Sequence, residues 1–138
     1  MLILVIDGQG GGLGRSITEK VLGWFPDADL IVLGTNAMAT ANMMRAGAKK
    51  GATGENAIRY NCARADVILG PLGIILPNAM LGEISPSISM AVLESPAEKI
   101  LFPVSNLHKL HVLGHTEKAW QDYFEETFSL LQKICGLK

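Results

Sequence analysis

A glycine-rich segment near the N-terminus carries the residues best suited to chemistry. Five of the seven residues from Gly8 to Gly14 are glycine, and they directly follow an apolar run that ends at Asp7. Glycine allows a positive φ, and its missing Cβ lets an anion come close to the backbone amides. A helix that begins near Leu13 would add unpaired N–H groups and a partial positive charge at the same place. The segment therefore predicts a phosphate-binding loop.

The spacing of these glycines favours one kind of phosphate loop. Gly8, Gly12 and Gly14 fit the pattern G-x-x-x-G-x-G of short-chain dehydrogenases and related extended Rossmann proteins, whereas G-x-G-x-x-G would need glycine at Leu13. The Walker pattern and its shortened MinD-like form both lack their lysines, because Arg15 stands where the last lysine belongs. A turn whose glycines only pack a helix on a strand is the alternative interpretation. The predicted cofactor-binding residues of this loop are Gly8, Gln9, Gly10, Gly11, Gly12, Leu13, Gly14, Arg15 and Ser16.

Two further places are expected to meet the rest of a nucleotide. Thr35 and Asn36 follow the second apolar run, where dinucleotide-binding proteins often carry an acid for the ribose. They can bind a ribose or, together with Arg15, a 2′-phosphate, and both are also good helix caps that need no ligand. Gly70 and Pro71 follow the third apolar run, where the adenine or nicotinamide half of a cofactor is expected. NAD or NADP is the cofactor class that this arrangement suggests.

Acidic and polar residues in the other glycine-rich stretches are candidates for catalysis. Glu55 and Glu83 are the carboxylates in these stretches, and either can serve as a general base or a metal ligand in a suitable pocket. A helix dipole explains Glu55 equally well, and exposure to solvent explains Glu83. Thr53, Asn56 and Asn78 are the predicted contacts of a second small molecule.

The histidines and cysteines predict neither a metal site nor a redox pair. His108, His111 and His115 are close in sequence, but a glycine breaks their segment and we expect them not to share a face. Cys62 and Cys135 lie far apart without CxxC spacing, which is typical of packed, reduced thiols. We therefore expect no bound metal.

Length and charge limit the class of protein. The chain has 138 residues, the size of a single domain (1–138), and a formal net charge of −1. That charge gives no drive toward nucleic acid or an anionic membrane. Asp7 ends the first apolar run too early for a signal peptide, and no run reaches the roughly 20 residues of a membrane span. We expect a cytoplasmic protein that binds a small-molecule nucleotide, with a homo-oligomer as a further option.

The elements that must position these residues alternate along the chain. Apolar runs at 2–6, 30–33, 67–69 and 100–102 predict buried parallel strands, and a weaker run at 110–113 predicts another. The fold predicted from them is α/β, with a three-layer, doubly wound and mostly parallel sheet of about five strands in one Rossmann-like domain.

Helices are predicted between and after these strands. Helical spacing predicts one from Leu13 to Trp24, and Thr35 or Asn36 can cap a second. Thr53 can cap a third, and an apolar stripe from 120 to 134 predicts a C-terminal helix. The stretch 70–85 is expected to form a loop and a short helix over the site end of the sheet.

Four short motifs together resemble a known family. They are VIDGQGGG at 5–12, LGTN at 33–36, GATGENA at 51–57 and LGEI at 81–84. With them, residues 1 to about 104 resemble a family of small bacterial proteins described as a domain of unknown function. The resemblance implies a Rossmann-like fold and no established activity.

Three functions remain open at this point. The first is a nucleotide- or dinucleotide-binding protein of unknown activity, with the phosphates on the glycine-rich loop. The second is a small enzyme that uses Glu55 or Glu83 on a small molecule. The third is a sensor or assembly subunit that binds a ligand without catalysis. The motifs do not decide whether the chain is an enzyme.

Overall fold

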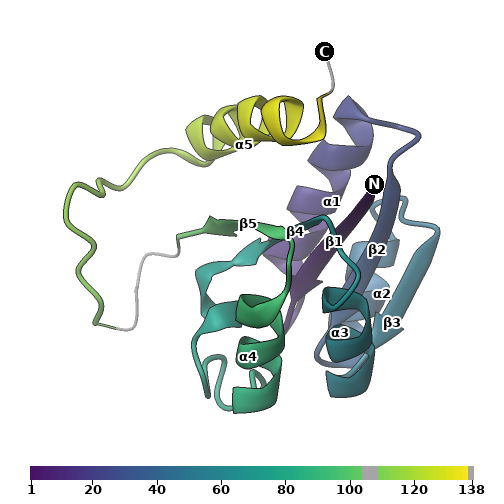
Figure 1. Ribbon diagram of the computed structural model, residues 1–138, viewed down its shortest axis with the longest axis vertical. Coiled ribbons are helices and arrows are strands. Elements are labelled where there is room, and N and C mark those ends of the chain that lie inside the picture. Colours follow the sequence, from purple (N-terminus) through teal and green to yellow (C-terminus); the bar gives the residue numbers. More distant parts are fainter. Residues whose placement is uncertain (104–108, 137–138) are drawn as a thin grey trace.

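The computed structural model describes residues 1–103 and 109–136, and it contains one parallel sheet of five strands in the order β3-β2-β1-β4-β5 (Figure 1). From the central strand β1 the chain builds outward to β3, crosses back to β4 beside β1, and continues to β5. The strand bounds are β1 (Leu2–Asp7), β2 (Asp29–Gly34), β3 (Lys50–Thr53), β4 (Val67–Pro71) and β5 (Glu98–Phe102).

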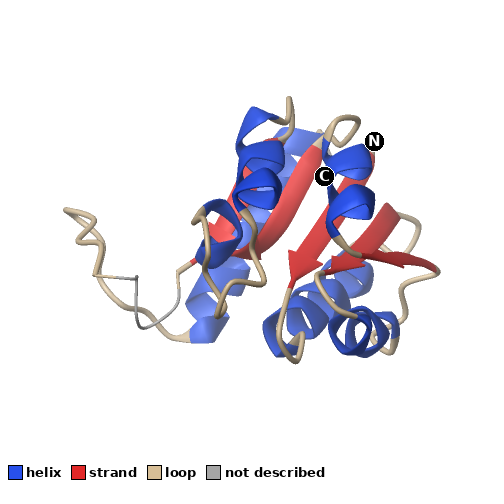
Figure 2. Cartoon of the chain, turned by 90° about the horizontal axis from the view of Figure 1, so that it is seen from below, coloured by secondary structure: helices blue, strands red, loops and turns tan. Residues whose placement is uncertain are grey.

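Helices cover both faces of this sheet (Figure 2). One face packs against α1 (Gly12–Trp24), α2 (Ala37–Met44) and α5 (Trp120–Cys135). The other packs against α3 (Glu55–Cys62), α4 (Pro86–Glu94) and the short 3-10 helix η1 (Leu72–Ile75). The prediction of a doubly wound, three-layer α/β fold is therefore confirmed.

The central strand shows why its sequence is a continuous apolar run. Leu4 and Ile6 belong to the core under α3 and α4, whereas Ile3 and Val5 belong to the core under α1 and α5. Successive strand side chains point to opposite faces, so a strand covered on both faces needs apolar residues throughout. Asp7 is the first polar residue of the strand, and it lies at the carboxyl end of β1.

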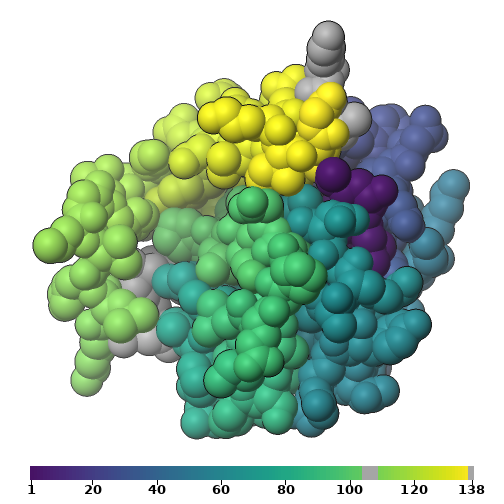
Figure 3. Space-filling model, in the orientation of Figure 1, coloured from purple at the N-terminus to yellow at the C-terminus, as the bar shows by residue number. Residues whose placement is uncertain are grey.

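The predicted strand at 110–113 is wrong, and β3 was not predicted. Leu110, Val112 and Leu113 are exposed and lie outside every strand, in a segment that stands away from the body of the protein (Figure 3). β3 has no apolar run, because it is a short edge strand whose backbone pairs with β2 while its side chains stay largely exposed. Apolar content alone therefore misplaced the fifth strand.

Two helix starts gave different outcomes. Asn36 caps α2 as predicted, since its side chain accepts a hydrogen bond of 2.9 Å from the Ala39 amide. Thr53 does not cap α3; it is the last residue of β3, and Gly54 occupies the cap position with φ 102°. Of the helices in the described part of the chain, none has both the length and the apolar character needed to cross a membrane.

Candidate functional site

A cavity opens where the carboxyl ends of β1 and β4 lie side by side. The chain leaves β1 toward β2 and leaves β4 toward β5, so the connections diverge and open a crevice between the two strand ends. Ligands of open α/β sheets bind at such switch points. The cavity here has a volume of about 510 Å³. It is lined by Asp7, Gly8, Gln9, Gly10, Gly11, Gly12, Leu13, Pro71, Gly73, Met80 and Leu81.

Asp7 organises the glycine-rich loop from the end of β1. Its two carboxylate oxygens accept hydrogen bonds of 2.7 Å from the Gly8 and Gly14 amides. Burial raises the pKa of the Asp7 carboxyl; the two amide bonds oppose this rise, and the charge of Glu83 adds to it. Asp7 was not among the site residues predicted from the sequence. The available signal was a charged residue at the end of an otherwise buried strand, directly before the glycines.

Glu83 reaches the same loop from the segment between η1 and α4. Its Oε1 atom accepts hydrogen bonds from the Gln9 amide at 2.8 Å, the Thr35 hydroxyl at 2.6 Å and the Asn36 side-chain amide at 2.9 Å. These bonds, led by the one from Thr35, lower the pKa of the Glu83 carboxyl. Glu83 thus connects the residues that follow β1 with those that follow β2. Exposure to solvent alone does not explain this glutamate.

Three of the five loop glycines are required by the fold itself. Gly11 has φ +71°, and a Cβ on it would lie 2.8 Å from the Ala39 carbonyl oxygen. A Cβ on Gly14 would lie 2.8 Å from the Asp7 Cβ, and one on Gly8 would lie 2.8 Å from the Thr35 hydroxyl. These contacts are too close for real side chains, so local packing explains these three glycines.

Gly10 and Gly12 have no such explanation. Neither has a positive φ, and a Cβ on either would meet nothing within 4 Å. Both residues are exposed at the cavity, and Gly12 is the first residue of α1. Two glycines are therefore present where the folded chain would accept a side chain.

The loop amides divide into bonded and unbonded groups. Two are bonded to Asp7, one to Glu83, and one to the Gly8 carbonyl oxygen at 2.9 Å. Three others have no acceptor within residues 1–103 and 109–136. These three belong to Gly10, Gly12 and Leu13.

The remaining predicted cofactor contacts are partly engaged elsewhere. Arg15 donates to the Asn42 side-chain oxygen at 3.1 Å, and the Ser16 hydroxyl donates to the Gly12 carbonyl at 3.3 Å. Neither residue lines the cavity, and nor do Thr35, Asn36 and Gly70. Gly70 and Pro71 are the last two residues of β4, and of these two Pro71 faces the cavity. The cavity thus contains Gly8 to Leu13 and Pro71 from the predicted set.

The residues predicted to hold a second small molecule are spread over the surface. The Thr53 hydroxyl lies 2.7 Å from the Thr40 hydroxyl at the edge of the sheet. Asn56 lines an open groove of about 840 Å³ between α3 and α4, and Asn78 is exposed after η1. The groove lined by Asn56 includes neither Thr53 nor Asn78. Glu55 accepts a hydrogen bond from the Ser85 hydroxyl and so joins the starts of α3 and α4.

The segment that carries Glu83 has an unusual backbone. Asn78, Met80 and Leu81 have positive φ values of 67°, 57° and 57°, and Gly82 follows with 92°. Residues other than glycine rarely adopt this conformation, and clusters of them are typical of functional sites. Met80 and Leu81 line the cavity, although Leu81 is 98% exposed. The sequence does not indicate a positive φ at Leu81, because leucine is not a residue type that favours it.

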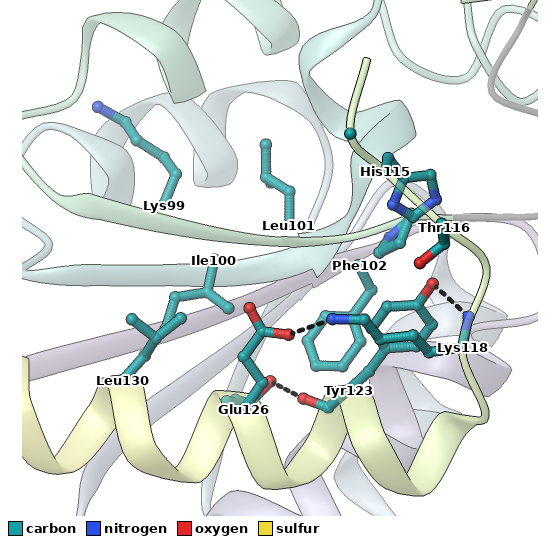
Figure 4. Close-up of a pocket in the computed structure, with 13 residues that line it drawn as sticks. Lys99, Ile100, Leu101, Phe102, His115, Thr116, Lys118, Tyr123, Glu126 and Leu130 are labelled. Carbon is teal, nitrogen blue, oxygen red and sulfur yellow. Dashed lines mark hydrogen bonds and ion pairs between the residues drawn. The ribbon is translucent and has the colours of Figure 1, made fainter. Parts of the chain in front are cut away.

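A second cavity of about 440 Å³ lies between β5 and α5 (Figure 4). Several of its polar groups are paired with one another. Lys118 forms an ion pair with Glu126 at 3.5 Å, and the Lys118 amide donates to the Tyr123 hydroxyl at 3.1 Å. This cavity shares no residue with the one at the glycine-rich loop. We therefore place the candidate site at the loop.

Metal-ligating and thiol groups add no second centre within the described residues. No three histidine, cysteine or acidic side chains gather there as metal ligands, and His108 lies outside the described residues. Cys62 is buried, and its burial raises the pKa of the thiol to about 11. Burial also raises the pKa of Cys135. Both cysteines are free thiols.

Comparison with known proteins places the fold but not an activity. No curated protein matches the sequence significantly. A solved structure that resembles the chain is a dodecameric FMN-dependent UbiX-like decarboxylase from Escherichia coli O157:H7. The TM-score is 0.52 and the sequence identity 15%, over 99% of this chain and 94% of the decarboxylase chain. This likeness supports the parallel α/β fold.

A family model supplies the classification of the sequence. The model describes DUF3842, a domain of unknown function, and it matches residues 2–136. The match includes the glycine-rich loop, the Glu83 segment and the C-terminal helix α5. The chain therefore belongs to the DUF3842 family.

Proposed function

We propose that the protein binds a phosphorylated nucleotide cofactor in the crevice between β1 and β4. The phosphate accepts hydrogen bonds from the amides of Gly10, Gly12 and Leu13. The observation that carries this proposal is that Gly10 and Gly12 face open space, so packing does not require glycine there. A side chain at either position would instead obstruct an anion on the neighbouring amides.

The start of α1 strengthens such a site. Gly12 and Leu13 open a helix of 13 residues, whose first amides have no partners within the helix and whose dipole favours an anion. The carboxylates of Asp7 and Glu83 lie on other amides of the loop. The amides of Gly10, Gly12 and Leu13 therefore stay available to a ligand.

FMN is the first candidate among such cofactors. The solved structure with a similar fold is FMN-dependent by its description. The cavity volume of about 510 Å³ lies in the range of small-molecule sites, and its wall includes the apolar residues Leu13, Pro71 and Met80. Such a wall suits a flat ring. An adenine nucleotide is the second candidate, whereas the comparison gives no support to the NAD or NADP suggested by the glycine spacing.

Paired variants on α1 test this proposal. Gly12→Val would place a side chain over the phosphate, whereas Gly23→Val adds the same atoms at an exposed glycine near the other end of the helix. Wild type should gain about 2.7 kcal/mol from a ligand at a hundred times its Kd, visible as a rise in Tm. We expect FMN to raise the Tm of wild type and Gly23→Val but not of Gly12→Val. An equal rise in Tm for all three proteins would show that the phosphate does not bind at this loop.

The lowered pKa of Glu83 bears on catalysis. A carboxylate held ionised by three hydrogen bonds is a poor proton donor and a weak base near neutral pH. We therefore propose a binding role for Glu83 and assign no reaction to it.

We further propose that the chain forms a homo-oligomer. The segment 109–119, which stands away from the body, and the start of α5 carry exposed apolar side chains (Figure 3). They are Leu110, Val112, Leu113 and Trp120, which are between 46% and 96% exposed. Apolar side chains gathered on one exposed segment are typical of protein contact surfaces. The similar solved structure is a dodecamer by its description, which supports self-association as the first candidate.

A further inference from the structure

Glu83 lies where nucleotide-binding α/β proteins commonly need an acid. In many of them an Asp or Glu after the second strand binds hydroxyl groups of the ribose. Here β2 ends at Gly34, and Thr35 and Asn36 follow without an acid. The carboxylate of Glu83 comes to this place from a different part of the chain and bonds to both of these side chains.

Among the residues that the structure describes, only one oxygen of this carboxylate accepts hydrogen bonds. Oε1 accepts all three hydrogen bonds, from Gln9, Thr35 and Asn36. In the described ranges of the chain, Oε2 has no hydrogen-bond partner. An ionised carboxylate has about four acceptor positions, so the second oxygen keeps its capacity for a donor. The bonds to Oε1 hold the group in place while Oε2 is unused.

Glu83 does not itself line the cavity, but its carboxylate lies against residues that do. Gln9, which donates to Glu83, lines the cavity, and so do Met80 and Leu81, which precede Glu83 in the chain. The Glu83 amide donates to the Met80 carbonyl at 3.2 Å, and the Asn78 amide donates to the Ile84 carbonyl at 2.7 Å. These bonds close the segment on itself and fix the position of Glu83 next to the proposed ligand.

We propose that Glu83 is a specificity-determining residue whose Oε2 accepts a hydrogen bond from a sugar hydroxyl of the bound nucleotide. This inference rests on the nucleotide function proposed above. The hydroxyl belongs to the ribityl chain of FMN or to the ribose of an adenine nucleotide, because both present the same donor. The negative charge excludes nucleotides that carry a phosphate on that hydroxyl.

The variant Glu83→Gln isolates this role. The glutamine oxygen can still accept the three bonds made by Oε1, whereas an NH2 group replaces Oε2 and turns the acceptor into a donor. We would measure the Kd of FMN and of its 2′-, 3′- and 4′-deoxy analogues, and the Kd of AMP and of its 2′- and 3′-deoxy analogues. Glu94→Gln removes the same charge from an exposed position on α4 and serves as the control.

In wild type, at least one deoxy analogue of whichever nucleotide binds should bind about tenfold more weakly than its parent, as for a hydrogen bond to a charged group. In Glu83→Gln this difference should shrink to within about twofold, while Glu94→Gln should keep it. If FMN binds in this way the donor is ribityl, and if AMP does it is ribose.

Wild type alone can overturn the inference, even when Glu83→Gln does not fold. Equal affinity for the parent nucleotide and all of its deoxy analogues would show that no sugar hydroxyl is recognised. An unchanged difference in folded Glu83→Gln would assign the recognition to another residue. Failure of the nucleotide function itself is distinct, because then neither FMN nor AMP binds wild type.

Discussion

Two carboxylates of the candidate site have pKa values that move in opposite directions. Burial raises the pKa of Asp7, so its charged form is less stable in the folded protein than in the unfolded chain. Hydrogen bonds lower the pKa of Glu83, so its charged form is stabilised by folding. Rising pH therefore destabilises the fold through Asp7, between its unfolded and its raised pKa. Falling pH destabilises it through Glu83, below its unfolded pKa and down to its lowered one.

The variant Asp7→Asn tests the first of these effects. Asparagine does not ionise, so the penalty for a buried charge disappears while one of the two amide bonds is lost. As pH rises from about 3.9 through the raised pKa, wild type should lose unfolding free energy relative to Asp7→Asn. Urea unfolding of both proteins between pH 4 and pH 7 measures this difference. If the unfolding free energies of the two proteins change in parallel over that range, burial does not raise the pKa of Asp7.

Of the residues at the candidate site, the sequence indicated the glycines but not the contacts of Asp7 and Glu83. The turn between β1 and α1 could be predicted, because five glycines after an apolar run are a dense local signal, whereas its binding of a phosphate stays a prediction. Asp7 was missed as a site residue because a polar residue at a strand end is common. The partners of Glu83 are 47 to 74 residues away in sequence, and no local pattern encodes contacts at that distance.

The β1–α1 loop contains glycines of two kinds: those that the fold requires and those at which the fold would accept a side chain. Gly11 needs a positive φ and lies against the Ala39 backbone, whereas Gly12 has a helical position and open space. Gly11→Ala should therefore lower the unfolding free energy by about 2 kcal/mol, from left-handed strain and the backbone contact. Gly12→Ala should change it by less than about 1 kcal/mol, because alanine favours helix more than glycine does.

Chemical denaturation of these two variants checks the division. A loss of stability in Gly12→Ala equal to that in Gly11→Ala would mean that packing requires both glycines. The binding proposal would then lose the observation that carries it.

The strands show what local pattern can and cannot supply. Buried strands such as β1 and β4 were predicted because both of their faces are covered and their residues are apolar, apart from Asp7 at the end of β1. β3 was missed because its four residues form a strand through backbone pairing with β2, which leaves no apolar pattern. Leu110, Val112 and Leu113 have the composition of a strand, but no neighbouring strand pairs with them in the described chain.

The molecule as a whole combines a well-packed α/β body with a projecting segment, 109–119, that carries exposed apolar side chains. Leu113 is 96% exposed on this segment, so its replacement should not disturb the fold of a single chain. If the segment contacts another copy, Leu113→Asp should lower the mass of the assembly measured by light scattering. Met38→Asp, at a 71% exposed residue on α2, is the matched control and should leave the mass unchanged. A wild-type mass of one chain at micromolar concentration would contradict the proposed homo-oligomer.

The fold class of the whole molecule could be predicted because alternating apolar runs and amphipathic helices leave few ways to cover a parallel sheet. The order of the strands places the glycine-rich loop and the end of β4 at one switch point. The candidate site then follows from topology. The identity of its ligand does not, because one fold supports many ligands through its loops.

Amide NMR during a titration with FMN would show whether the phosphate binds at the glycine-rich loop. Hydrogen bonds to a phosphate shift the resonance of each donating amide. We predict large, saturable shifts at Gly10, Gly12 and Leu13, and small shifts at Gly8 and Gly14, whose amides are bonded to Asp7. If FMN binds and shifts other residues while these three stay unchanged, the phosphate does not bind at this loop.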